Sequence, residues 1–286
     1  MKSSIILIRS LVKNTFQNFY RKSGAFLKKD FINQTSYRLS FFLNILSIFL
    51  AVYIFFIFSK LFEGTNTYLE EYGNNYFFFL IIGISLSDLV LRVSSVVNTE
   101  VRNYQLTGMF EEIINLKSST LELLSYSFIY PILYSCFRLF IFLFCSVAFF
   151  ELSLNFENLG LIFITLALVL ISCLGIAFIS GAYAIAFKKG NPLSAVNQMS
   201  VMILGGVFFP TEILPSWLST ISEIIPITHA LEIIRYLLMS DTSFNDAVGN
   251  NLIILLMLSS LLLFLGIFAC NKAIKIGKKN GTLTLY

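Results

Sequence analysis

Three charged residues lie within stretches of sequence that are otherwise apolar and long enough to cross a membrane. Asp88 and Arg92 are four residues apart, the order and spacing that favour an ion pair on one face of a helix. Arg138 lies near the middle of the next apolar stretch. A charge at the centre of a bilayer costs about 2.5–3.5 kcal/mol on insertion scales, so each side chain requires a partner or a watery cavity. Two interpretations stay open: the residues line a substrate route, where an arginine binds an anionic headgroup, or both arginines share Asp88 in an internal brace.

The remaining residue types offer little catalytic chemistry. His229 is the only histidine, and none of the four cysteines belongs to a CxxC or Cys/His spacing. The Gly-Lys pair at 277–278 lacks the first glycine and the Ser or Thr of a phosphate-binding loop. The sequence therefore predicts no catalytic, cofactor-binding or metal site, and it argues against a membrane enzyme that acts on lipids.

The amino-acid composition is that of a membrane protein, so the three charged residues are predicted to lie on membrane-spanning helices. Of 286 residues, 57% are hydrophobic and 13% are charged, and the mean hydropathy is +0.81. A soluble domain carries roughly twice that charged fraction. Lipid offers no hydrogen bonds to the backbone, which favours helices over strands. We predict an all-α membrane protein with six transmembrane helices, at residues 39–61, 76–97, 128–150, 159–187, 194–210 and 251–271.

The distribution of basic residues predicts how these helices are oriented. Of the 20 Lys and Arg residues, Lys60 and Arg235 fall on one side, and Arg92 and Arg138 lie within spans. The other 16 fall on the side that holds both termini. Since basic loops favour the cytoplasm, both termini are predicted to be cytoplasmic. The basic residues alternate with apolar stretches rather than gathering on one surface, which argues against nucleic acid as a partner.

Residues 1–38 precede the first predicted span and have the pattern of a basic amphipathic helix. Their apolar residues recur at helical spacing, at Ile5, Ile8, Val12, Phe16 and Phe19. A helix of this kind lies on the surface of a membrane. We predict a cytoplasmic interface helix at 1–38, with a partly ordered tail as the alternative, followed by a transmembrane domain at 39–286.

The loop between the second and third predicted spans contains a short helical segment at about 109–117. Gly108 precedes this segment. Glu111 and Glu112 lie in its first turn and Lys117 lies at its end, so the charges suit the helix dipole at both ends. The segment is either a docking helix for a partner or an ordinary solvated helix.

The same loop ends in a helix-capping signal. Ser119 and Glu122 have the spacing of a capping box, in which each residue hydrogen-bonds the backbone of the other. This spacing predicts that the helix leading into the third span begins at Ser119.

The stretch at about 210–239 is too apolar for an exposed loop and too interrupted for a membrane span. Three prolines break any continuous helix, and the pattern between them predicts two short amphipathic helices, at roughly 215–225 and 227–239. Trp217 is typical of the membrane interface. We predict a helical hairpin that dips back into the outer leaflet, where neighbouring protein covers its backbone. Such a hairpin acts either as an exit gate or as a plug that packs the bundle.

These residues resemble the region before the last span of type-2 ABC exporter permeases. Members of that family carry a Gly-rich stretch, a Phe-Pro, a Leu-Pro-x-Trp, a Pro-x-Thr-His and a Glu-x-x-Arg. The corresponding residues are Gly205-Gly206, Phe209-Pro210, Leu214-Pro215-Ser216-Trp217, Pro226-Ile227-Thr228-His229, and Glu232 with Arg235. The segment that follows Gly108 is similar to the family's coupling helix, which commonly begins Gly-Thr-Leu-Glu, although Met109 replaces the usual Thr.

The resemblance implies a permease that exports a hydrophobic or amphipathic substrate, with ATP and Mg²⁺ bound to a separate nucleotide-binding ATPase subunit. Two copies, or this chain and a paralogue, would form a dimer in contact with lipid in a prokaryotic plasma membrane. The residues implied in coupling to the ATPase are Gly108, Phe110, Glu111, Glu112 and Ile113. The residues implied in the exit gate are Phe208, Phe209, Pro210, Pro215, Trp217 and His229. A stand-alone secondary transporter or channel is the alternative, but ion coupling favours more membrane-embedded carboxylates than Asp88 alone.

Overall fold

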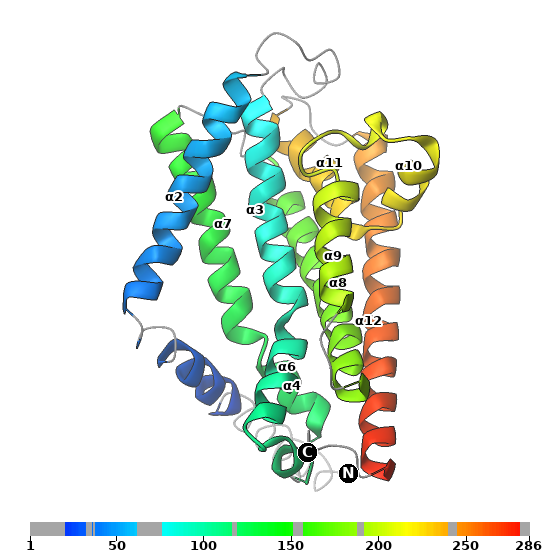
Figure 1. Ribbon diagram of the computed structural model, residues 1–286. Coiled ribbons are helices and arrows are strands. Elements are labelled where there is room, and N and C mark those ends of the chain that lie inside the picture. Colours follow the sequence, from blue (N-terminus) through cyan, green and yellow to red (C-terminus); the bar gives the residue numbers. More distant parts are fainter. Residues whose placement is uncertain are drawn as a thin grey trace, which may run out of the picture.

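The computed structural model describes residues 21–32, 36, 38–61, 76–115, 119–150, 157–187, 192–239 and 245–280, and most of these are helical (Figure 1). No strand occurs in these ranges, so the predicted all-α class is confirmed. The longer helices are α2 (Arg38–Lys60), α3 (Tyr76–Ser94), α4 (Val96–Leu106), α7 (Ile129–Phe150), α8 (Leu159–Phe187), α11 (Pro226–Met239) and α12 (Asp246–Asn280). The shorter ones are α5 (Phe110–Asn115), α6 (Thr120–Tyr126), α9 (Pro192–Met199) and α10 (Ser216–Ser222).

Five helical stretches are long and apolar enough to cross a membrane. They are α2, α3 with α4, α6 with α7, α8, and α12. Helix α12 ends at the end of the bundle where α4 and α6 also lie, and the helix at 21–32, which precedes α2, lies toward the same end (Figure 1). We call this the basic end, because α4 carries the exposed Arg102 and the last part of α12 carries the exposed Lys272 and Lys275. Of the predicted interface helix, residues 21–32 are helical and residues 1–20 lie outside the described ranges.

The predicted fifth span at 194–210 is shorter in the structure. Helix α9 continues into a π-helix, η2 (Ser200–Leu204), and the helical stretch then ends at Gly205. At 1.5 Å per residue this stretch is about 20 Å long, less than the ~30 Å of a bilayer core. The count of six full spans is therefore not confirmed. The physical reason is the glycine pair that follows, in which Gly206 has a φ of +72° and turns the chain.

The two short helices of the predicted hairpin are present. Helix α10 follows Pro215, and α11 begins with Pro226, so each proline lies at a helix start, where its missing N–H costs nothing. Helix α11 is almost wholly buried in the bundle, whereas α10 lies at its edge with most residues exposed. Their depth in a membrane stays a prediction.

Helix α3 lies at the centre of the bundle and α2 lies at its outside. Residues 77–87 of α3 are all buried, because apolar or small side chains cover every face of the helix. Helix α2, by contrast, buries only Ile48, Val52 and Ser59. Asp88 and Arg92 follow this buried stretch and are half-buried, and α2 forms an outer wall beside them.

Helices α8 and α12 approach most closely at a pair of glycines. A Cβ atom on Gly175 would overlap the carbonyl carbon of Leu262, and one on Gly266 would overlap the carbonyl oxygen of Gly175. Such close backbone packing is how membrane helices associate without a hydrophobic driving force. These two positions therefore require glycine.

We expect a Gly175→Val substitution to destabilise the protein by about 1–3 kcal/mol or more, because the new side chain cannot fit between the two backbones. The measurement is the thermal unfolding midpoint of detergent-purified protein, followed by size-exclusion chromatography. Gly160→Val is the matched control on the same helix, since a Cβ there meets nothing within 4 Å. Equal midpoints for the two variants would contradict the packing argument.

Candidate functional site: a charged cavity within the helix bundle

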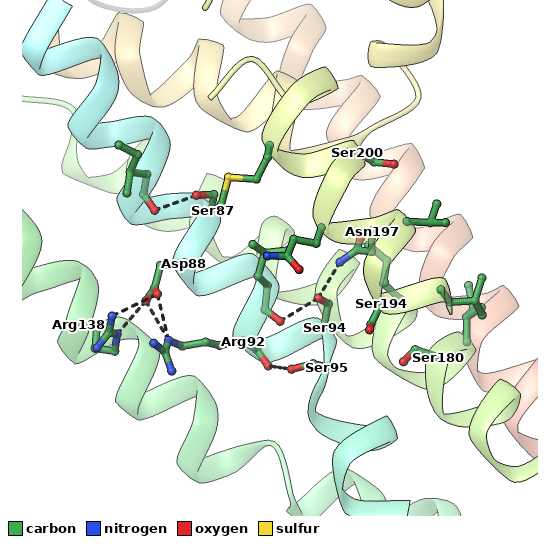
Figure 2. A pocket seen from close by; sticks show the side chains of 18 of the residues that line it. Ser87, Asp88, Arg92, Ser94, Ser95, Arg138, Ser180, Ser194, Asn197 and Ser200 are labelled. Atoms are coloured by element: carbon green, nitrogen blue, oxygen red, sulfur yellow. Dashed lines mark hydrogen bonds and ion pairs between the residues drawn. The ribbon is translucent and has the colours of Figure 1, made fainter. Parts of the chain in front are cut away.

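Asp88, Arg92 and Arg138 form one ion cluster inside the bundle (Figure 2). Arg92 Nε donates to both carboxylate oxygens of Asp88, at 3.1 and 3.0 Å, along α3. Arg138 on α7 donates to the same carboxylate through Nε at 2.8 Å and Nη2 at 3.2 Å. The two arginines thus share one carboxylate, which is the contact that a brace requires.

This cluster does not balance electrically. Two guanidinium groups and one carboxylate together carry a net charge of +1. The third nitrogen of Arg138, Nη1, donates to the backbone carbonyl of Asn44 at 3.2 Å, which carries no formal charge. The side chain of Arg138 is 5% exposed, whereas that of Arg92 is 38% exposed. An uncompensated cation in a low-dielectric surrounding favours an anionic partner. The cluster can therefore attract a negatively charged group as well as hold α3 to α7.

The ion cluster lies in the wall of a cavity of about 820 Å³. Helices α2, α3, α7, α8 and α9, with η2, line this partly open cavity, and its volume is typical of small-molecule sites, which span about 300–1,000 Å³. The wall mixes apolar side chains with a set of small polar ones. The polar set is Ser47, Ser87, Ser94, Ser95, Ser180, Ser194, Asn197, Gln198 and Ser200.

Helix α9 contributes the polar wall opposite the ion cluster. Asn197 Nδ2 donates to the hydroxyl of Ser94 at 3.0 Å, which joins α9 to α3 across the cavity (Figure 2). Neither residue was predicted to belong to a site. A signal was available, because the second predicted span is polar in its second half, and Ser194 and Asn197 are three apart on one helix face.

The residues predicted to contact an ATPase lie at the basic end of the bundle. Gly108 has a φ of +72°, a left-handed conformation that ends α4 and turns the chain into α5. Phe110 is 1% exposed and holds α5 against the bundle. Glu112 is exposed and Ile113 is half-buried. The side chain of Glu111 lies outside the described residues.

The capping box predicted at the start of α6 is wrong in its hydrogen bonds. Ser119 does occupy the N-cap position, with extended backbone, but its side chain makes no capping bond. Glu122 instead binds Lys22 at 2.8 Å and accepts from Tyr126 at 3.0 Å. The hydrogen bond to Glu122 raises the pKa of Lys22. The competing cation, which comes from the helix at 21–32, explains the missing capping bond.

The residues predicted to form an exit gate lie in or near α10 and α11, at the end of the bundle opposite the basic end. Phe208 and Phe209 are half-buried and Pro210 is buried, so the loop after η2 packs against the bundle. Pro215 occupies the N-cap position of α10. Trp217 is 66% exposed, as an interfacial side chain would be.

His229 belongs to a hydrogen-bonded network between helices. Its Nε2 donates to the carbonyl of Glu223 at 2.8 Å, and its Nδ1 lies 3.0 Å from Oδ1 of Asn251. Asn251 in turn donates to Glu232 at 2.9 Å. Within the described residues, no group of three or more His, Cys, Asp and Glu side chains could hold a metal ion. The network joins α10, α11 and α12.

Arg235 was predicted to lie on the side of the membrane opposite the two termini. In the structure it is buried in the α10–α11 hairpin. Its side chain is 2% exposed, and its guanidinium carbon lies 3.4 Å from the centroid of the Phe79 ring. Nη1 donates to the carbonyl of Gly206 at 2.8 Å, and Nη2 donates to those of Phe79 and Val207, at 2.9 and 3.2 Å. Arg235 therefore ties α11 to α3 and to the loop after η2.

The sequence of residues 7–239 matches the family described as ABC-2 type transporter. The match covers most of the chain, from the N-terminal segment to the end of α11, and so includes the ion cluster, α5 and the hairpin. No curated protein matches the chain.

Proposed function

The chain belongs to the ABC-2 type transporter family and is a multi-pass membrane permease of an ABC-type transporter, and from this premise we propose that it exports an amphipathic substrate through the cavity beside Asp88. One observation carries the proposal: a cavity of about 820 Å³ with a net positive wall opens within an otherwise apolar bundle. A charged group in lipid is costly and marks a functional pathway by default. The mixed lining suits a molecule with both a polar and an apolar part.

A separate ATPase subunit would supply the energy. Members of this family generally work with an ABC ATPase, and this chain has no phosphate-binding loop of its own. Helix α5 suits the contact, because the buried side chain of Phe110 holds it against the bundle while the side chain of Glu112 is exposed. ATP and Mg²⁺ would then bind to the partner, and α5 would connect the partner to α4 and α3.

The basic end would face the cytoplasm of a prokaryotic cell, and α10 would face outward, with α11 and its loop as the exit gate. The excess of Lys and Arg at one end supports this orientation. A second permease, either another copy or a paralogue, would pack on α9 and η2, whose large apolar side chains Val196, Met199 and Ile203 are exposed beside the cavity. Lipid would cover the remaining apolar surface.

We expect the permease to co-purify with the ABC ATPase encoded beside it, and a Glu112→Lys substitution to reduce the bound ATPase at least about fivefold. A reversed charge at a docking contact costs roughly 1 kcal/mol or more, which corresponds to that factor. The measurement is the ratio of the two subunits after affinity purification in detergent, followed by ATPase activity in liposomes.

The matched control is Glu223→Lys, which makes the same charge change in an exposed residue at the other end of the bundle. It is expected to leave the subunit ratio unchanged. A permease that is stable and transports substrate with no ATPase attached would overturn the proposal in favour of a stand-alone transporter. Equal loss of ATPase in both variants would overturn the role of α5.

A further inference from the structure

The two arginines of the ion cluster differ in how much of each guanidinium is used. Each of the three nitrogens of Arg138 donates to an acceptor, in Asp88 or in the backbone of α2. Arg92 uses only Nε, and within the described residues its Nη1 and Nη2 have no hydrogen-bond partner. The excess positive charge of the cluster is therefore presented by Arg92, with two nitrogens available to an anion.

Arg92 also lies between two cavities. Together with Ser95 it lines both the cavity of about 820 Å³ and a second one of about 530 Å³, which Ser40, Tyr134 and Ser135 also line. Two carboxylates, Asp30 and Glu100, line the second cavity as well, and Lys29 pairs with them at 3.2 and 3.6 Å, so the cation available to an anion there is Arg92. Ser135 is 1% exposed, and within the described residues its hydroxyl has no hydrogen-bond partner. A buried hydroxyl of this kind favours a polar ligand or water in the second cavity.

A polar stripe on α2 leads from the start of this helix to these cavities. Ser40, Asn44 and Ser47 follow one another at helical spacing and, together with Arg38, line an open depression on the surface of α2. Ser40 also lines the second cavity, and Ser47 also lines the largest. The stripe thus leads from the first residue of α2 to the level of the ion cluster.

The part of α2 that carries this stripe is not packed against the bundle. None of the residues 38–47 is buried, and the first buried residue of α2 is Ile48. In Figure 1 the two helices α2 and α3 lie close together at the α10 end and diverge toward the basic end. Helix α7 lies behind this gap, and the stripe on α2 is accessible from the side of the bundle because none of its residues is buried. Large apolar side chains, Leu39, Phe42, Leu43 and Leu46, are exposed on α2 around the stripe.

We propose that an amphiphile with an anionic headgroup, a phosphate or a carboxylate, enters from the inner leaflet between α2 and α3 and binds through its headgroup to Arg92. The headgroup passes along Ser40, Asn44 and Ser47, while the apolar tail stays in lipid beside α2. Charge complementarity selects the anion, and the sideways opening selects a lipid-like molecule over a soluble ion. This inference rests on the proposed transport function, because it names the substrate class of the same cavity.

The test is protection of a cysteine in the cavity. Ser47→Cys is introduced with Cys136→Ser, because Cys136 is exposed and the other three cysteines are buried. The permease and its ATPase are placed in phosphatidylcholine nanodiscs, and the rate of labelling by N-ethylmaleimide is followed by mass spectrometry. Three probes are compared: dodecyl phosphate, inorganic phosphate and dodecyltrimethylammonium. We expect dodecyl phosphate alone to slow labelling, at least about fivefold at saturation.

Adding Arg92→Gln is expected to weaken protection by dodecyl phosphate about tenfold or more, since a charge-assisted contact is lost. Lys60→Gln, which removes a cation at the far end of α2, is expected to leave it unchanged. Protection by the ammonium amphiphile, or an Arg92→Gln variant that binds normally, would overturn the headgroup site. Protection by inorganic phosphate alone would mean that a soluble anion enters from water, and would overturn the lipid route.

The route along α2 has its own pair of variants. Ser40→Trp fills the polar stripe and is expected to slow the onset of protection severalfold, whereas Phe42→Trp, on another face of α2, has no such effect. Equal onset in both variants would overturn the route. A Ser40→Trp variant that dissociates a permease dimer would show that a second copy covers this face, and would also overturn it. Because ATPase binding is measured in the same samples, loss of the ATPase would be recognised as failure of the broader proposal.

Discussion

An Arg138→Gln variant is expected to yield little folded protein. Removing one partner of a buried ion pair costs about 3–5 kcal/mol. Asp88 keeps Arg92 as its counter-ion, so the loss comes from the hydrogen bonds that Arg138 alone makes. Here the loss would break two hydrogen bonds to Asp88 and one to the carbonyl of Asn44, and so separate α7 from both α3 and α2. The measurement is the yield of monodisperse protein and its thermal unfolding midpoint in detergent.

Two comparisons make that result specific. Arg92→Gln is expected to unfold at nearly the wild-type midpoint, since Arg92 is partly exposed and bonds only through Nε. The double variant Asp88→Asn/Arg138→Gln is expected to lose less stability than the sum of the two single variants, because both substitutions remove the same two hydrogen bonds between α3 and α7. Equal losses of stability in Arg92→Gln and Arg138→Gln, or additive losses in the double variant, would contradict the conclusion that Arg138 contributes more to stability than Arg92.

An Arg235→Leu variant is expected to lose the fold of the α10–α11 region, at a cost of at least about 2 kcal/mol. The substitution leaves the buried loop carbonyls of Gly206 and Val207 without this donor, and each unsatisfied group costs about 1–3 kcal/mol. It also removes the bond to the carbonyl of Phe79, which keeps its partner within α3. Limited proteolysis should then cut in the loop around Gly206, which the wild type protects, and the unfolding midpoint should fall.

The control for this variant is Arg102→Leu, which removes an exposed arginine from α4. Substitutions of exposed residues usually change the free energy of unfolding by less than about 0.5 kcal/mol. Arg235→Lys should fall between the two, because an ammonium keeps the charge but cannot span three carbonyls in the planar geometry of a guanidinium. Wild-type stability of Arg235→Leu would show that the buried guanidinium is dispensable.

The features that were predicted correctly depend on residues close together in the sequence. The predicted fourth span and α8 coincide at residues 159–187, because the apolar run is bounded by Glu157 and by Lys188. The pairing of Asp88 with Arg92 follows from helical spacing alone. The fifth span was overestimated, because hydropathy does not reveal a π-helix that ends at Gly205.

The contacts that sequence reasoning missed join residues far apart along the chain. Asn197 and Ser94 are brought together only by the packing of α9 on α3. The burial of Arg235 depends on backbone carbonyls that have no helical partner because the helix before Gly206 ends there. The residue types alone do not predict that these carbonyls are available. The bond of Glu122 to Lys22, in place of a cap, likewise requires the helix at 21–32 to be placed first.

The near-continuity of α3 and α4 has a mechanical consequence. The two form a rod of 31 residues, Tyr76–Leu106, which at 1.5 Å per residue is about 46 Å long. Its one irregularity is the turn at Ser95, three residues past Arg92. The rod acts as a lever whose lower tip carries α5 and whose middle carries Asp88, roughly 27 Å away. Force applied at α5 is therefore delivered to the charged cavity by leverage, and any bending is concentrated beside the arginine that faces it.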